Sequence, residues 1–180
     1  MKGKGTTIIG CLFPFVMGVC SNLPDENPPC RFFMASEVND YTYLGKFVEY
    51  LEHLAKKAAR LCEQRFAKLK LVIEHHLQQA RFSGNKYGIR IHEENLKKLH
   101  DFIHSLPILG YNSSAFDSKV IRQFVIPCLI DRYGIKNISV RCKGCKYSLL
   151  QTPYFRLIDQ MNVSSCLDAR VFVDARVFSI

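Results

Sequence analysis

The chain has no apolar run long enough to cross a bilayer as a helix, which takes about 20 residues. The apolar stretch Ile8–Cys20 is shorter than that and is interrupted by Pro14. It follows two lysines and resembles a signal peptide, although Cys20 is a poor cleavage-site residue. A buried strand, or a non-native start of the reading frame, is the alternative for Met1–Cys20. We expect no membrane partner.

The chain also lacks a cysteine framework. It has eight cysteines, but they are scattered and do not follow the spacing of a disulfide-rich domain. A chain of 180 residues can bury roughly 70% of its unfolded surface, so it needs no disulfide for stability. Cys62, on the apolar face of a predicted helix, and Cys128, at a helix end, are typical positions for buried free thiols. The pattern favours a reducing compartment, nuclear or cytoplasmic, over secretion.

Acidic residues are few relative to basic ones. The chain has 16 Asp and Glu against 25 Lys and Arg, which gives a net charge of +9. Such a surface favours nucleic acid or anionic membranes by simple electrostatics and carries no information on the fold. With no membrane segment, we expect DNA as the partner. The alternative is a basic protein without this specialisation.

Glycine and proline are absent between Lys46 and Leu77, where apolar residues recur at three- and four-residue spacing. This pattern predicts one long amphipathic helix, or two in line, from Tyr43 onward. The apolar positions are Leu44, Phe47, Val48, Leu51, Leu54, Ala58, Leu61, Cys62, Phe66, Leu69, Val72, Ile73 and Leu77. The basic positions are Lys46, Lys56, Lys57, Arg60, Arg65, Lys68 and Lys70. A solvated face explains these charges more simply than a DNA-binding face does.

Complete metal-binding motifs are missing as well. Five histidines (His75, His76, His92, His100 and His104) occur in or near predicted helices without an HExxH pattern. Of these, His100 and His104 are one helical turn apart and are expected to face the same way. Cys142 and Cys145 have zinc-knuckle spacing, but no second pair follows them. We therefore interpret the histidines as surface residues and the cysteine pair as part of a hairpin turn.

The remaining segments give shorter elements. We expect a loop over 21–29 and a short strand over Arg31–Ala35. A loop over Phe82–Gly88 precedes a second helix carrying the apolar positions Leu96, Leu99, Ile103 and Leu106. Beyond the centre of the chain we expect Pro127 to end or kink a helix and a turn at Asp131–Gly134. Strands are then predicted over Ile135–Arg141, Tyr147–Gln151 and Tyr154–Asp159, and the tail 167–180 repeats Asp-Ala-Arg-Val-Phe twice without an assigned role.

The most informative stretch is Leu106–Asp117, which reads as a buried strand and a polar turn before an amphipathic helix ending near Pro127. Asp117 would lie near the positive end of the helix dipole, where a metal-binding carboxylate is well placed. Asn112 and Asp117 are also residue types that build strand-to-helix turns routinely. Taken by themselves, Asn112 and Asp117 are better explained as residues that build a turn than as a metal-binding site.

A resemblance changes that balance. Leu-Pro-Ile-Leu-Gly-Tyr-Asn-Ser-Ser-Ala-Phe-Asp, ending at Asp117, is similar to the second exonuclease motif of family B DNA polymerases. Its flanks resemble the protein-primed subgroup of viruses, linear organellar plasmids and Maverick/Polinton-type transposons. Lys146–Asp159 resembles a strand pair of that family, and Pro29–Phe32 with Phe47–Leu51 resembles its lead-in more weakly. The resemblance covers about residues 29–166.

The resemblance implies a fold class and a chemistry. The fold would be α/β, a partial ribonuclease-H-like exonuclease fold with a long amphipathic helical insertion. Asp117 would be a catalytic carboxylate that binds Mg²⁺ or Mn²⁺, and Asn112 would contact the 3′-terminal nucleotide of single-stranded DNA. Phe116 would pack behind Asp117 within this DNA-binding segment.

The departures from the family pattern limit the expected activity. The first exonuclease motif, Asp-x-Glu, does not occur in the sequence. Asp25 and Glu26 come nearest to it, but they are adjacent and lack the residue between. The third, Tyr-x3-Asp, is missed by one residue at Tyr154 and Asp159, and the polymerase palm carboxylates are missing. We therefore expect an atypical segment 1–28, a partial exonuclease-like domain 29–166 and the tail. Such a chain would be inactive alone and would work with DNA and the missing polymerase parts. The rivals are a basic helical binding module and a small secreted protein.

Overall fold

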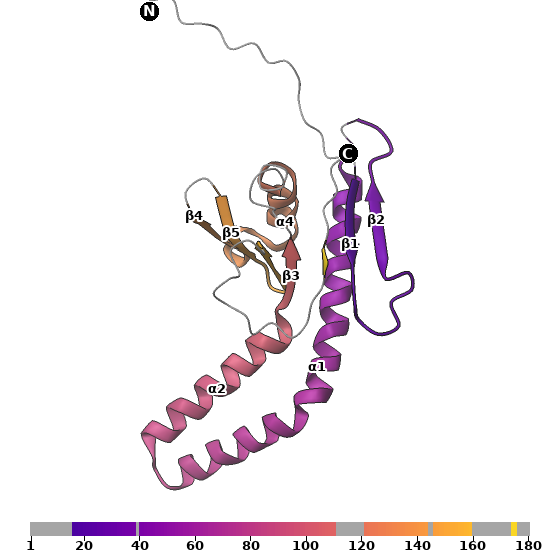
Figure 1. The fold of residues 1–180 in the computed structure, drawn as a ribbon. Helices are drawn as coiled ribbons and strands as arrows, with labels where there is room; N and C mark the ends of the chain where they lie inside the picture. Colours follow the sequence, from indigo (N-terminus) through magenta and orange to yellow (C-terminus); the bar gives the residue numbers. More distant parts are fainter. Residues whose placement is uncertain (1–15, 39, 111–120, 144–145, 160–173, 176–180) are drawn as a thin grey trace, which may run out of the picture.

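The computed structural model describes residues 16–38, 40–110, 121–143, 146–159 and 174–175. They form a mixed α/β structure with a β-hairpin, a long helical pair and a five-stranded sheet (Figure 1). The α/β class predicted from the sequence is confirmed. Within the described ranges, no helix combines the length and hydropathy needed to cross a membrane.

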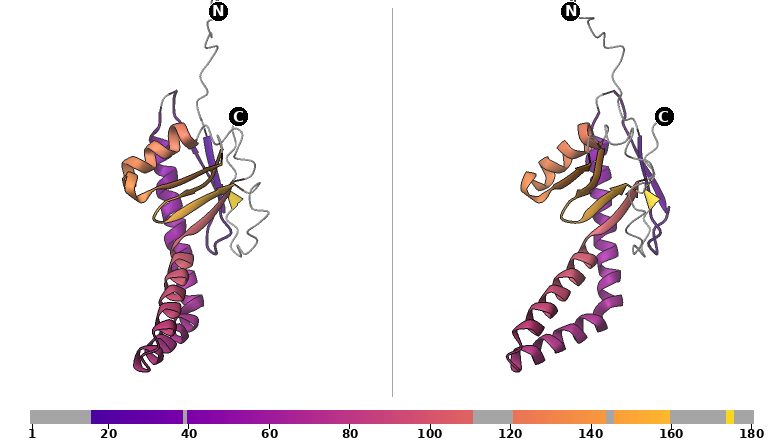
Figure 2. Two further views of the ribbon diagram at one scale, coloured as in Figure 1. Left: turned by 90° about the vertical axis from the view of Figure 1, so that its left-hand side faces the viewer. Right: turned by 60° about the vertical axis from the view of Figure 1, so that its left-hand side comes forward.

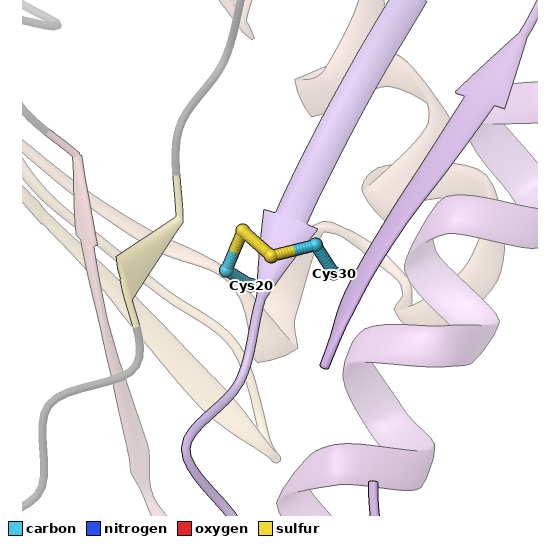
Figure 3. Close-up of a disulfide and its surroundings, with 2 residues drawn as sticks. All are labelled: Cys20 and Cys30. Atoms are coloured by element: carbon cyan, nitrogen blue, oxygen red, sulfur yellow. A yellow bond between two sulfur atoms is a disulfide. The ribbon is translucent and has the colours of Figure 1, made fainter. Parts of the chain in front are cut away.

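The hairpin pairs β1 (Val16–Cys20) with β2 (Cys30–Met34) in antiparallel register, so that Cys20 lies opposite Cys30. A disulfide joins these two cysteines (Figure 3), a bond that the scattered cysteine pattern did not predict. Met17 and Val19 are buried in the main core, which corresponds to the buried-strand alternative for this part of the N-terminal segment. The predicted strand over Arg31–Ala35 is confirmed to within one residue.

The predicted long helix is α1 (Thr42–Phe82), a continuous helix of 41 residues, or roughly 60 Å at 1.5 Å per residue. Asp40 precedes it and accepts hydrogen bonds from the hydroxyl and the backbone N–H of Thr42 and from Ser36. These bonds to the ionised form hold the pKa of Asp40 well below its usual range. The carboxylate therefore fixes the start of the helix.

The two halves of α1 have different surroundings. From Leu44 to Ala58 the apolar stripe is buried in the core with the hairpin and the sheet. Beyond Ala58 the helix extends away from the sheet (Figures 1 and 2), and Leu69 and Val72 are exposed. Near the far end the stripe is buried again at Leu77, where the two helices of the pair meet.

The second helix of the pair is α2 (Lys86–His104). Asn85 caps its start by accepting a hydrogen bond from the N–H of Gly88, and Arg81 of α1 is paired with Glu93 of α2 at 2.9 Å. The predicted loop over Phe82–Gly88 is confirmed in position but is shorter, since only residues 83–85 lie outside the two helices. The second predicted helix is confirmed, but it ends before Leu106, which belongs to the next strand.

The sheet has the strand order β4-β5-β6-β3-β7. Its strands are β3 (Leu106–Gly110), β4 (Ser139–Lys143), β5 (Lys146–Gln151), β6 (Phe155–Asp159) and β7 (Asp174–Ala175). Strands β4, β5 and β6 form an antiparallel meander, whereas β3 is parallel to both β6 and β7. The predicted strands at β5 and β6 are confirmed to within one residue, and the predicted hairpin between β4 and β5 is confirmed.

Between β3 and β4 the chain forms η1 (Ile121–Val125), a π-helical turn, α4 (Ile126–Tyr133) and the short 3₁₀ helix η2 (Ile135–Asn137). The predicted turn at Asp131–Gly134 is wrong, because α4 continues to Tyr133. Pro127 lies in the first turn of α4, where its missing N–H needs no helical partner. The helix ends instead at Gly134, whose φ is 78°. The first part of the predicted strand Ile135–Arg141 is helical, so β4 begins only at Ser139.

Candidate functional site

Asn112, Phe116 and Asp117, the three residues of the predicted nuclease motif, lie outside the described residues. The structure does describe both flanks of their segment, β3 before it and η1 with α4 after it. The geometry of these flanks shows what holds the chain on either side of the segment.

The entering flank is a largely buried strand. Ile108 and Leu109 are 1% and 6% exposed, and β3 lies between β6 and β7. Apolar residues on both faces are typical of a strand covered on both sides. The motif therefore begins at a fixed point, the carboxyl end of a central strand.

A second acidic residue lies at the same edge of the sheet. Parallel pairing of β3 with β6 places Gly110 beside Asp159 in the backbone register. Sequence reasoning treated Asp159 only as the end of a strand that misses the third exonuclease motif by one residue. The paired residues Gly110 and Asp159 are about fifty positions apart, so no local pattern in the sequence predicts that they meet. The one local indication of a site was an apolar strand that ends in Asp. The carboxyl ends of parallel strands are common ligand sites in α/β sheets.

The leaving flank is fixed to α1 by a polar cluster. Arg132 of α4 donates to both carboxylate oxygens of Glu52, from Nε at 2.6 Å and from Nη2 at 3.1 Å. The hydroxyl of Tyr133 donates to the same carboxylate. The hydrogen bonds from Arg132 and Tyr133 outweigh the effect of burial and lower the pKa of Glu52. Val125 and Leu129 add buried apolar contacts to the core, so both flanks are held firmly.

A further ion pair involves Glu26, one of the two acidic residues considered for the missing first motif. Its side chain is 5% exposed and accepts hydrogen bonds from Lys57 Nζ at 2.9 Å and from the Tyr50 hydroxyl at 3.0 Å. Burial alone raises the pKa of Glu26, but the bonds from Lys57 and Tyr50 outweigh it and lower the pKa. Glu26 therefore joins the 21–29 loop to α1 and is engaged structurally. Lys57, predicted on the solvated face, is part of this pair.

The other candidate metal ligands that the structure describes do not form a metal site. Among the described residues, no three His, Cys, Asp or Glu side chains lie close enough to hold a metal ion. His100 and His104 do face one another, with ring centroids 4.3 Å apart. Cys62 and Cys128 are free as predicted, but they are half-buried where buried thiols were expected, and burial raises the pKa of both thiols. The side chains of the Cys142 and Cys145 pair lie outside the described part of the chain.

The basic face of α1 is solvent-exposed, apart from Lys57. Its exposed members are Lys46, Lys56, Arg60, Arg65, Lys68 and Lys70. Lys70 is within 3.9 Å of Glu74, a weak surface pair. The prediction that this charged face is exposed to solvent is confirmed. The same exposure would also allow a polyanion to bind there.

Comparison of this chain with protein-family models, curated proteins and solved structures found no match.

Proposed function

We propose that this chain is part of the 3′–5′ exonuclease region of a family B DNA polymerase of the protein-primed type, with a partial ribonuclease-H-like fold. The parent function is template-directed DNA synthesis with proofreading. The observation that carries the proposal is the parallel β3–β6 pair. It brings Asp159 beside Gly110, at the point where the segment containing Asn112 and Asp117 leaves the sheet.

The residue types proposed for this site, two aspartates, suit a divalent metal ion of the Mg²⁺ or Mn²⁺ type. Both ions prefer oxygen ligands, and carboxylates are the usual protein donors. Asp117 is the primary ligand in this proposal, and Asp159 is the added candidate that the strand register supplies. When bound, the metal would polarise the phosphodiester and activate water. Asn112 would contact the terminal nucleotide, and Phe116 would pack behind Asp117 and keep its direction.

The proposed activity of the isolated chain is binding without cleavage. Two-metal phosphodiester hydrolysis needs several carboxylates around both ions. The first-motif pair Asp-x-Glu is missing, and Glu26 is committed to Lys57 and Tyr50. Single-stranded 3′ ends and primer–template DNA are the expected ligands, and the other polymerase parts are the expected protein partners.

The test compares linear single-stranded DNA with a circle of the same sequence. A site built for the 3′ terminus binds the linear strand more tightly, because only that strand offers a free end. Asn112→Ala should weaken linear binding by about two- to tenfold, the loss of one hydrogen bond, and should leave circular binding unchanged. Ser139→Ala is the matched control, since Ser139 is exposed at the start of β4. Equal affinity for the two forms would contradict the proposal.

A nuclease assay tests the inactive state. Labelled single-stranded DNA incubated with Mg²⁺ or Mn²⁺ should stay intact. Metal-dependent release of mononucleotides that Asp117→Ala abolishes would show a working site and overturn the claim of inactivity.

A second candidate is a basic helical binding module without catalysis. The observation that favours it is the α1–α2 pair, which projects away from the sheet (Figure 2). This pair carries exposed cations and exposed apolar residues. Arg65→Glu with Lys68→Glu would then reduce linear and circular binding equally, and binding would fall with salt. The 3′-end preference decides between the two candidates, because only the first requires it.

A further inference from the structure

A cavity of about 490 Å³ lies between the end of α2, the β5–β6 turn and β6. It lies beside Ser105, which directly precedes β3, whereas the nuclease motif follows Gly110 in the chain. Its volume falls within the roughly 300–1,000 Å³ of small-ligand sites. The residues that line it and matter here are Lys98, Phe102, Ser105 and Arg156.

Two lining residues have buried polar atoms without partners. Nε of Arg156 and Oγ of Ser105 make no hydrogen bond within the described part of the chain. Buried polar groups are almost always paired, so two in one cavity wall call for an explanation. A guanidinium N–H and a hydroxyl are both donors. Because both atoms are buried, the side chains of Arg156 and Ser105 have to turn toward the cavity before an oxyanion bound there can accept hydrogen bonds from them.

The charge of the wall also suits an anion. Lys98 and Arg156 are cationic, Asp101 is the acidic lining residue, and His100 and His104 add ring N–H donors. Lys98 is within 2.8 Å of Glu94, but its side chain is 69% exposed, so it can reorient toward a ligand. The cations therefore outnumber the carboxylates that line the cavity.

The opposite wall is rigid. Thr152 is 4% exposed, accepts a hydrogen bond from the N–H of Phe155 at 3.0 Å and donates to its carbonyl at 2.9 Å. The N–H of Leu106 donates to the carbonyl of Tyr154 at 3.0 Å. These bonds hold the β5–β6 turn against β3. Phe102, 43% exposed, adds an aromatic surface on which a base can stack.

We propose that this cavity binds a phosphate-bearing ligand of about mononucleotide size. The phosphate accepts hydrogen bonds from Arg156 and Ser105 and is balanced by Lys98, while the base lies on Phe102. This site is independent of the proposed nuclease motif, which follows β3 in the chain, whereas Ser105 precedes it.

Calorimetric titration of the full chain tests the proposal with adenosine monophosphate, adenosine and inorganic phosphate. The monophosphate should bind more tightly than either of the others, because only it has both phosphate and base. A short oligonucleotide with and without a 5′-phosphate then distinguishes a chain end from a free nucleotide. Tighter binding of the phosphorylated oligonucleotide than of the monophosphate assigns the site to a chain end, and the reverse order assigns it to a free nucleotide.

Arg156→Gln should weaken monophosphate binding by at least about tenfold, as expected for loss of a charge-assisted hydrogen bond. Arg60→Gln removes the same charge from an exposed position on α1 and should have little effect. Lys98→Gln, at an exposed side chain, gives a second measurement if Arg156→Gln does not fold. Asp117→Ala should leave this binding intact whatever the nuclease assay shows. Absence of monophosphate binding, or equal weakening by Arg156→Gln and Arg60→Gln, would overturn the proposal.

Discussion

Removing Glu52 should loosen α4 and destabilise the fold. The Glu52 side chain is 10% exposed and receives two hydrogen bonds from Arg132, whose side chain is 33% exposed. A hydrogen bond to a charged group contributes about 1.5–3 kcal/mol, and removing one partner of a buried pair costs about 3–5 kcal/mol. Because Arg132 can regain water, Glu52→Ala should lower the unfolding free energy by about 2–3 kcal/mol.

Glu49 supplies the matched control in the same cluster. It also contacts Arg132, at 3.3 Å, but its side chain is 60% exposed. Glu49→Ala should therefore cost about 0–1 kcal/mol, as exposed ion pairs do. Urea unfolding followed by circular dichroism measures both variants. If the two lose the same stability, the buried cluster does not anchor α4 and the reasoning is wrong.

The pH dependence of this contribution has a defined sign. The folded-state pKa of Glu52 is lowered, chiefly by the hydrogen bond from Arg132. The contribution is therefore fully present above the unfolded pKa of about 4.3 and is lost as the pH falls through the lower folded value. The stability difference between the wild type and Glu52→Ala should shrink below about pH 4. A difference that grows on acidification would contradict this.

Two further predictions concern the core and the hairpin. Leu54 is fully buried, so Leu54→Ala should cost about 2–5 kcal/mol, whereas Leu71→Ala, at an exposed position of the same helix, should change stability by under about 0.5 kcal/mol in urea unfolding. Reduction of the Cys20–Cys30 disulfide, which closes a ten-residue separation, should cost about 2–3 kcal/mol. Comparing thermal unfolding of the wild type and Cys20→Ser with and without reductant checks this, and an equal response of both proteins would refute it.

The long helix could be predicted because its signal is local. Apolar residues at three- and four-residue spacing continue from Leu44 to Leu77 without glycine or proline after Gly45. The same periodicity could not show which half of the helix packs against other elements and which half is exposed. Leu54 is buried and Leu69 is exposed on similar patterns, because only the first half of α1 meets the sheet and the hairpin.

The errors around Pro127 have a different cause. A proline after an amphipathic stretch predicts a helix end, but here it lies in the first turn of α4, after a π-helical turn. Hydrogen bonds from Arg132 and Tyr133 to Glu52, about 80 positions earlier, then hold the last turn of the helix. Tertiary contacts of this kind have no local signature.

The proposed site shows the same division between local and tertiary signals. The pattern around Asn112 and Asp117 is contiguous, so a site there can be proposed from the sequence, whereas the register that brings Asp159 beside Gly110 depends on strand pairing. The cavity beside Arg156 also depends on tertiary structure, since its walls come from α2, the β5–β6 turn and β6. The disulfide was missed because the nine residues between Cys20 and Cys30 do not reveal an antiparallel hairpin.

Titration of Mn²⁺ into the full chain, followed by electron paramagnetic resonance of the free ion, tests the central proposal most directly. Asp117→Asn and Asp159→Asn should each weaken Mn²⁺ binding by at least about tenfold, since loss of even an outer-shell partner costs that much. Asp131→Asn, at an exposed position of α4, should bind as the wild type does. Unchanged Mn²⁺ affinity in Asp117→Asn would contradict the assignment of a nuclease-type metal site to this segment.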